Sequence, residues 1–267
     1  MSYQHILLER HGGVARLVLN RPESRNAMTP QMGQEVAAAV DELNADPTVR
    51  VVVVRGAGKA FSGGGSLEAL EQEAAAASGG GDQKAQGLGG GRNFYRAYLS
   101  LRRLEVPSIA AINGHAIGAG LCFALGCDMR VMHESAKAGM TFVRLGIHPG
   151  MAATWTLPRL VGPARAAELL FTGKLIDAAQ ALAWGLVNRV AGDDFDAQVD
   201  ALAAEVVGSG PVAVRAVKRT LRGTFSRDIE EALGLEADAQ KMTFGTIDAL
   251  EGIRAIREKR PPRFEGR

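Results

Sequence analysis

The sequence predicts an α/β fold whose core strands pair mainly in parallel, followed by a helical C-terminal region. Residues 49–54, VRVVVV, form an almost continuous apolar run, which is typical of a strand buried on both faces. Residues 49–70 and 106–124 each combine such a run, a glycine-rich turn and the start of a helix, the order that builds parallel sheets. Beyond residue 157 the apolar positions recur with helical spacing, and glycines and prolines mark the breaks.

The size and charge of the chain indicate a large globular unit. It has 267 residues, of which 46% are hydrophobic and 22% charged, so a sizeable core is expected. We predict a core over residues 1–195 and a C-terminal helical region over 196–267. The net charge of +2 is too small to indicate a nucleic acid or an anionic membrane as the partner. No apolar run reaches membrane-spanning length and the N-terminus lacks an apolar leader segment, so a cytoplasmic protein is expected.

The other elements follow in order along the chain. HILLER (5–10) and VARLVLN (14–20) are short apolar runs separated by HGG, which predicts a hairpin. Thr29 before Pro30 predicts a helix start, and helical spacing continues to residue 46. CDMRVM (127–132) predicts a further strand. Residues 74–91 are glycine-rich and low in complexity, which predicts a mobile surface loop, with a lid over a binding site as the alternative.

The two cysteines of the chain, Cys122 and Cys127, lie five positions apart on one predicted helix. Their side chains then point in different directions, so we expect no disulfide between them. Their spacing is also unlike that of a zinc site.

Five stretches together resemble the crotonase (enoyl-CoA hydratase/isomerase) superfamily. They run in the order of that superfamily and cover nearly the full chain. The stretches are NRPESRNAM (20–28), GAGKAFSGGGSL (56–67), VPSIAAINGHAIGAGLCFALGCDMRV (106–131), LGIHPGMAATWTLPRLVG (145–162) and EKRPPRF (258–264).

The resemblance implies a crotonase-like spiral of ββα units with a helical C-terminal trimerisation region, assembled as a homotrimer or a dimer of trimers. It also implies an acyl-CoA thioester as the ligand, with coenzyme A as part of the substrate and no further cofactor or metal. In that superfamily two backbone N–H groups bind the thioester oxygen, and the matching residues are Gly65 and Ala119. Two fixed donors would stabilise an enolate or a tetrahedral oxyanion by several kcal/mol, on the order of 3 kcal/mol for each. The alternative is that both turns are only tight connections between strands and helices.

The resemblance extends to the coenzyme A part of the ligand. It places Arg25 near the phosphates and the backbone of Gly63 and Gly65 near the adenine. Lys259 is expected to reach a phosphate from an adjacent subunit. Arg25 and Lys259 also have an alternative interpretation as ordinary surface charges, because a cation near a pyrophosphate needs no particular geometry.

The common proton-transfer positions of the superfamily carry other residues in this chain. Hydration of an enoyl thioester needs a base and an acid. The resemblance places them on two glutamates, at the positions of Cys122 and Phe142. The acid that isomerases use matches residues 149–151, Pro-Gly-Met, where it is also absent. Hydration by the usual two-glutamate mechanism is therefore not expected.

Several other side chains could act as a nucleophile or a base in the reaction, or have structural roles. Cys122 could be a nucleophile activated near a helix start, or a small apolar core residue. His148 could be a general base at neutral pH, or structural. His115 lies in the predicted turn and reads as a hydrogen-bonding core histidine. Tyr95 and Tyr98 are expected to line the acyl pocket.

Further polar residues near the two turns have structural interpretations. Ser66 is expected to cap the following helix rather than to supply a catalytic hydroxyl, and Asp128 is expected to be a structural turn partner. Glu68, Glu71 and Glu73 are candidates for relocated acids, although their spacing suggests a solvated helix face.

Three functions remain open from the sequence. The first is an enzyme acting on an acyl-CoA by decarboxylation, isomerisation or thioester hydrolysis, since loss of CO2 from a β-carboxyl thioester forms an enolate without a base. The second is a non-catalytic carrier of long-chain acyl-CoA, in which Phe142 adds apolar contact with the chain at roughly 25 cal/mol per Å² buried. A purely structural subunit has the least support, because both glycine turns are intact.

Overall fold

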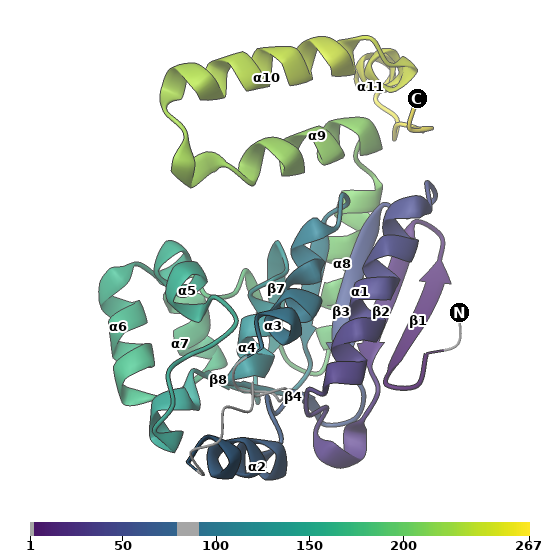
Figure 1. Ribbon diagram of the computed structural model, residues 1–267. Helices are drawn as coiled ribbons and strands as arrows, with labels where there is room; N and C mark the ends of the chain where they lie inside the picture. The colour runs from purple at the N-terminus through teal and green to yellow at the C-terminus, as the bar shows by residue number, and fades with distance from the viewer. Residues whose placement is uncertain (1–2, 79–90) are drawn as a thin grey trace.

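The computed structural model describes residues 3–78 and 91–267, and the larger of its two sheets has six strands (Figure 1). The order in this sheet is β1-β2-β3-β5-β7-β10. β1 and β2 form the predicted antiparallel hairpin, and every other neighbouring pair is parallel. The strands are β1 (Ile6–His11), β2 (Val14–Leu19), β3 (Val51–Gly56), β5 (Ser108–Ile112), β7 (Met129–His133) and β10 (Arg189–Ala191).

Four short strands form a second sheet in the order β4-β6-β8-β9. They are β4 (Ala60–Ser62), β6 (His115–Ile117), β8 (Lys137–Gly139) and β9 (Leu175–Asp177). β4, β6 and β8 each follow a strand of the large sheet almost at once, so the chain repeats a long strand and then a short one. The sequence analysis took the residues of β4 and β6 as parts of glycine-rich turns. Strands of three residues are too short to show an alternating pattern, which explains the error.

The helices that surround the two glycine turns begin at recognisable signals. In α1 (Pro30–Ala45), the hydroxyl of Thr29 accepts the N–H of Met32 at 3.2 Å, as the predicted helix start requires. The hydroxyl of Ser66 accepts the N–H of Ala69 at 3.1 Å and caps α2 (Leu67–Ser78). α3 (Arg92–Leu99) and α4 (Ala119–Ala124) complete this group. Residues 74–78 therefore belong to a helix rather than to the predicted loop, and 79–90 lie outside the described residues.

The remaining helices follow along the chain in the order of Figure 1. They are α5 (Ala153–Val161), α6 (Pro163–Thr172), α7 (Ala178–Ala183), α8 (Phe195–Val207), α9 (Pro211–Leu221), α10 (Ile229–Phe244) and α11 (Ile247–Glu258). Single 3-10 turns span Pro22–Ser24, Ser100–Arg103, Thr141–Leu145 and Thr224–Ser226. Within residues 3–78 and 91–267, every helix is too short or too polar to span a bilayer.

The large sheet is covered on both faces, as its valine run predicts. One face packs against α8, where Phe195 and Val199 contact a cluster that includes Val51 and Val53. The other face packs against α1 and belongs to the main core. α8 therefore lies on the sheet, and the proposed boundary at residue 195 stays a prediction.

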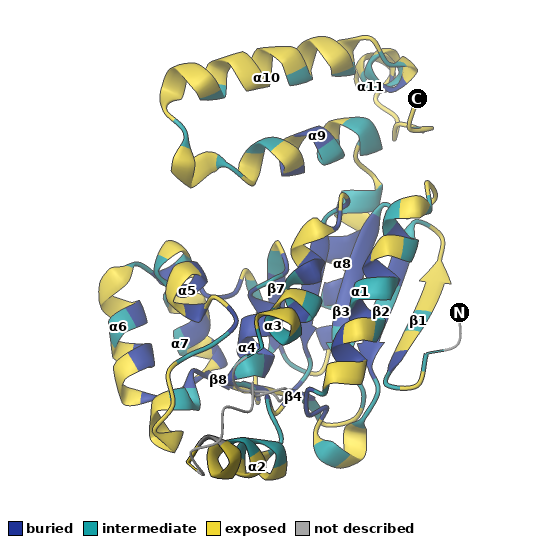
Figure 2. Cartoon of the chain, viewed as in Figure 1, coloured by how far each residue is buried: buried dark blue, intermediate teal, exposed yellow. Residues whose placement is uncertain are grey.

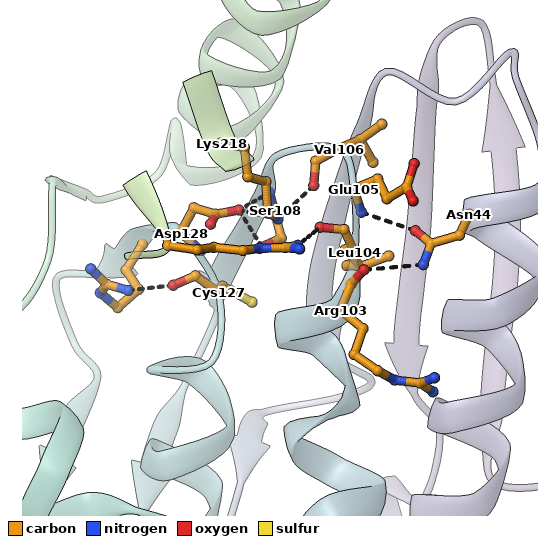
Figure 3. Close-up of polar contacts among 11 residues, drawn as sticks. Asn44, Arg103, Leu104, Glu105, Val106, Ser108, Cys127, Asp128 and Lys218 are labelled. Atoms are coloured by element: carbon orange, nitrogen blue, oxygen red, sulfur yellow. Dashed lines mark hydrogen bonds and ion pairs between the residues drawn. The ribbon is translucent and has the colours of Figure 1, made fainter. Parts of the chain in front are cut away.

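The helices α9, α10 and α11 extend away from the sheets as an arm (Figure 1). The arm is fastened to the core through Lys218 of α9. Its Nζ donates to the carbonyl of Val106 and to the carboxylate of Asp128, both at 2.7 Å (Figure 3). Asp128 also accepts the N–H and the hydroxyl of Ser108, which agrees with its predicted role as a structural partner. None of the residues of α10, all of which the structure describes, is buried (Figure 2).

A cleft of about 740 Å³ separates the arm from the core. Its lining includes Trp155 and Arg159 of α5, and Lys218 and Leu221 of α9. Neither of the two glycine turns lines it. This cleft is therefore a gap between the arm and the core and is distinct from the candidate site.

Candidate active site

The two glycine turns lie directly against each other. A Cβ atom built on Gly64 would be 2.7 Å from the carbonyl oxygen of Ile117 and 3.3 Å from the nitrogen of Ala119. Gly64 also has a φ of +87°, a conformation that side chains disfavour. In the same way, a Cβ on Gly120 would be 2.4 Å from the carbonyl oxygen of Ser62. Glycine at these positions lets the first turn approach the start of α4.

The N–H groups of Gly65 and Ala119 are left unused at this junction. Among the hydrogen bonds that join the described residues, none involves either of them. Their neighbours, in contrast, are engaged. Gly63 donates to the carbonyl of Arg25, and Gly118 donates to the carbonyl of Gly139, each at 2.8 Å. Two backbone donors, one from each turn, are therefore left over at this junction.

Asn26 and Ser62 hold the first turn in place. The Asn26 side chain is fully buried, and its amide nitrogen donates to the carbonyls of Ala57 and Ala60 at 2.9 Å. The hydroxyl of Ser62 donates to the carbonyl of Asn26 at 2.9 Å and accepts the N–H of Gly64 at 3.2 Å. The sequence analysis gave neither residue a role. The asparagine in NRPESRNAM was the available sequence signal for Asn26, but a single sequence does not show that an asparagine is buried.

Cys122 and Phe142, which stand at the two positions without a glutamate, have apolar or weakly polar side chains. The Cys122 sulfur is buried and lies 3.7 Å from the Met140 sulfur and 3.7 Å from the Gly150 carbonyl oxygen. Burial raises the pKa of the Cys122 thiol to about 12, so the nucleophilic thiolate does not form at neutral pH. Phe142 is half-buried, and its ring lies 3.9 Å from a Cβ built on Gly118. Its phenyl group therefore borders the turn that carries Ala119.

Both histidines considered for the chemistry point to solvent. His148 is exposed, and its Nδ1 lies 2.8 Å from the carbonyl oxygen of Pro149. His115 is exposed at the start of β6, where its Nδ1 accepts the N–H of Lys137 at 3.2 Å. The expectation of a core histidine in the turn was wrong for His115, because the short strand β6 turns its side chain outward.

The tyrosines of α3 take different roles. Tyr98 is buried, and its hydroxyl donates to the carbonyl of Thr29 at 2.7 Å, so it ties α3 to the start of α1 rather than lining a pocket. Tyr95 is half-buried, and its hydroxyl oxygen lies 2.6 Å from a Cβ built on Gly150. Gly150 is the residue whose carbonyl contacts Cys122. Tyr95 therefore reaches the wall beside one of the positions without a glutamate.

The three glutamates of α2 differ in how far they are exposed to solvent. Glu68 and Glu71 are exposed, as a solvated helix face predicts, whereas Glu73 is half-buried. Burial of the phenol and the nearby Glu73 carboxylate raise the pKa of Tyr95.

Of the four residues predicted to contact coenzyme A, three lie together within one chain and Lys259 lies far from them. Arg25 is exposed, has a φ of +54°, and its Cβ lies 3.6 Å from a Cβ built on Gly63. Arg25, Gly63 and Gly65 thus form one edge of the site. Lys259 caps the C-terminal end of α11, which lies at the opposite end of the molecule from α2 and β4 (Figure 1). Within a single chain Lys259 does not join the other three.

Comparisons with known proteins agree on one family. The family model for enoyl-CoA hydratase/isomerase matches residues 9–267. The crotonyl-CoA hydratase of Syntrophomonas wolfei is 36% identical over 267 residues, which cover 99% of each chain. The crystal structure of an enoyl-CoA hydratase from Bacillus anthracis superimposes with a TM-score of 0.88 at 32% identity, covering 99% of this chain and 100% of that one. An enoyl-CoA hydratase structure from Polaromonas gives a TM-score of 0.88 at 30% identity, covering 97% of this chain and 99% of that one. The predicted crotonase-like fold is confirmed, and the chain belongs to the enoyl-CoA hydratase/isomerase family of the crotonase superfamily.

Proposed function

We propose that this protein is an enzyme that binds an acyl-CoA thioester and stabilises its oxyanion or enolate with the N–H groups of Gly65 and Ala119. The observation that carries the proposal is the junction of the two glycine turns, where one N–H from each turn has no acceptor among the described residues. Fixed donors aimed at a developing negative charge are among the largest single contributions to catalysis. Coenzyme A enters as part of the substrate, and no other cofactor is proposed.

The reaction that asks least of this site is decarboxylation of a β-carboxyl thioester. Breaking the bond to the carboxylate carbon releases CO2 and leaves its electron pair on C2, so the enolate forms without a base. Cys122 and Phe142 then need to supply no carboxylate. Isomerisation and thioester hydrolysis also pass through a charged thioester oxygen, and each needs a proton carrier at another position.

The alternative is a carrier that holds long-chain acyl-CoA without turnover. It is supported by the apolar character of Phe142 and by the buried, protonated thiol of Cys122. Both residues favour contact with an acyl chain over proton transfer.

A homotrimer or a dimer of trimers is the assembly that we propose. Large apolar side chains are exposed on α10 and α11, and burial of such a surface normally drives association. They include Leu233, Met242, Phe244, Leu250 and Ile253. In such an assembly, Lys259 of one subunit could approach Arg25 of another and contact a coenzyme A phosphate.

The test is product analysis with a panel of acyl-CoAs: saturated, 2-enoyl, 3-enoyl and malonyl-type thioesters. Each is incubated with the purified protein and analysed by liquid chromatography with mass detection, alongside a binding titration. Loss of CO2, release of free CoA, gain of water or a shifted retention time at equal mass would each identify a reaction. Tight binding without a product would favour the carrier, and binding of no thioester would overturn both.

A matched pair of variants tests the donor itself. Ala119→Pro removes the N–H at the first position of α4, where a proline is compatible with a helix. Ala119→Ser keeps the N–H and serves as the control. We expect kcat to fall by roughly 100-fold or more for Ala119→Pro and to change little for Ala119→Ser. Equal activity of the two variants would contradict the assignment of this donor.

A further inference from the structure

The candidate site contains a hydroxyl that the sequence analysis treated as a passive wall. Tyr95 lies on α3, which packs on α4 through the edge-to-face contact of Tyr98 with Phe123, 5.6 Å between ring centres. The Tyr95 hydroxyl oxygen and its ring carbon Cζ lie 2.6 and 2.8 Å from a Cβ built on Gly150. The Gly150 carbonyl in turn contacts the Cys122 sulfur at 3.7 Å.

This chain of contacts places the Tyr95 hydroxyl beside Gly150, which borders Cys122. Cys122 lies in the first turn of α4, and its N–H donates to the carbonyl of Gly118 at 3.1 Å. The phenol therefore approaches the same turn that offers the Ala119 N–H, on the side where Cys122 replaces an acid.

Glu73 adds a negative charge near the phenol. It lies on α2, which begins two residues after Gly65, and it is half-buried where its helix neighbours Glu68 and Glu71 are exposed. Burial and the Glu73 carboxylate raise the pKa of Tyr95. The hydroxyl therefore keeps its proton at neutral pH, which is the form that a proton donor needs.

We propose that Tyr95 is the catalytic acid that protonates C2 of the thioester enolate held at Gly65 and Ala119. This inference rests on the function proposed above. In the step, the enolate electron pair forms the new bond from C2 to hydrogen, and the bond from hydrogen to the Tyr95 oxygen breaks. The resulting phenolate regains a proton from water, and the nearby Glu73 carboxylate disfavours the persistence of the second negative charge.

The other side chains considered for proton transfer are placed less well. The Tyr98 hydroxyl is engaged with Thr29. The histidine side chains His115 and His148 are exposed. The Cys122 thiol is buried, and Phe142 carries no proton to give. Tyr95 combines a protonated hydroxyl with contact to the site wall.

The experiment compares the wild-type protein with Tyr95→Phe, which removes one oxygen atom and keeps the ring. Every panel thioester that the wild type converts is incubated in D2O, and the panel includes a malonyl-type thioester with a 2-methyl group. Deuterium at C2 of the product and its configuration are read by mass spectrometry and NMR. Acyl-CoA affinity and the melting temperature are measured for each variant.

We expect the wild type to place one deuterium at C2 in a single configuration. In Tyr95→Phe, turnover should fall by roughly 100-fold or more and the residual product should be a mixture of configurations, because water reaches either face. Affinity should change little. Glu71→Gln, on the exposed face of α2, should leave turnover unchanged and serves as the control.

The remaining outcomes separate the two proposals. If Tyr95→Phe keeps the rate and configuration, or if the product forms without deuterium at C2, the role of Tyr95 is overturned while an acyl-CoA enzyme remains. If the wild type binds thioesters but converts none, the role of Tyr95 falls together with catalysis, and the carrier is favoured. If no thioester binds, the proposed function itself fails. A Tyr95→Phe protein that does not fold is replaced by Tyr95→Trp, judged by the same configuration test.

Discussion

The glycine-turn site and the C-terminal arm are held in place by different parts of the chain. At the site, backbone atoms of two turns pack directly against each other, and the close approach exists because side chains are absent at Gly64 and Gly120. The arm is attached through long side chains, above all Lys218 bonded to Asp128 and Val106. The comparison shows that the same chain fixes one region by excluding side chains and the other by using them.

Substitution of glycine should separate the two regions most sharply. Gly120→Ala places a Cβ 2.4 Å from the Ser62 carbonyl oxygen, and that backbone must shift. We expect the free energy of unfolding to fall by about 3 kcal/mol, measured by urea denaturation. Gly234→Ala in α10 is the control, because no atom lies within 4 Å of the new Cβ and alanine favours a helix, so stability should rise by up to about 1 kcal/mol. The same sign for both substitutions would contradict the comparison.

Removal of the Lys218 side chain should destabilise the protein, whereas the glycine substitution in the arm should stabilise it. Lys218→Met leaves the Val106 carbonyl and the Asp128 carboxylate without this donor. The Lys218 side chain is 8% exposed, but Asp128 is 40% exposed, so water screens part of the loss. We expect unfolding free energy to fall by about 2 kcal/mol, while Arg219→Met on the exposed side of α9 changes little. Equal effects of the two variants would show that the arm is fastened elsewhere.

A charge on the apolar surface of the arm should weaken association. Ile253 is 45% exposed on α11, and its burial in an assembly would be lost in Ile253→Glu. We expect the dissociation constant of the assembly to rise about tenfold, which corresponds to a loss of about 1.4 kcal/mol of association free energy. Sedimentation at several protein concentrations measures it, with Asp238→Asn on α10 as the control. A wild-type protein that is monomeric at all concentrations would contradict the proposed assembly.

The smallest expected effect concerns the pH dependence of the buried thiols. Burial raises the pKa of Cys127 to about 12, whereas a thiol in the unfolded chain ionises near pH 8.5. The folded pKa is the higher one, so this contribution to stability is complete well below pH 8.5 and is lost as the pH rises through 8.5 toward 12. Between pH 7 and 8.5 each thiol should lower the free energy of unfolding by about 0.4 kcal/mol. Urea denaturation at both pH values should show that the free energy of unfolding decreases less in Cys127→Ala than in the wild type, by this amount. An identical decrease in the two proteins would indicate that the thiol ionises in the folded protein.

The sequence was sufficient where a pattern was long or its residues were distinctive. The hairpin, α1 with its Thr29 cap, and the buried valine strand were confirmed, because their patterns extend over many residues. The strands β4, β6 and β8 were missed because each has three residues, and His115 was wrongly placed for the same reason.

The chemistry of the site depended more heavily on three-dimensional contacts. The resemblance assigned Gly65 and Ala119 of two separate turns to one oxygen, but the contact between the turns, at Gly64 and Gly120, is visible only in the structure. The roles of Asn26 and Ser62 depend on burial and on hydrogen bonds to distant residues. The difference between Tyr95 and Tyr98 is also one of packing, since three positions along α3 separate a half-buried tyrosine from a buried one.

The unused N–H groups at the turn junction belong to the main chain, and this affects how such a protein can change over generations. A point mutation that exchanges a side chain at Gly65 or Ala119 leaves the N–H in place unless it introduces proline. Side chains such as Cys122, Phe142 and Tyr95 are replaced freely by single codon changes. If the two N–H groups bind the thioester oxygen as proposed, a lineage can therefore keep binding one class of ligand while it acquires, loses or exchanges the side chains that transfer protons.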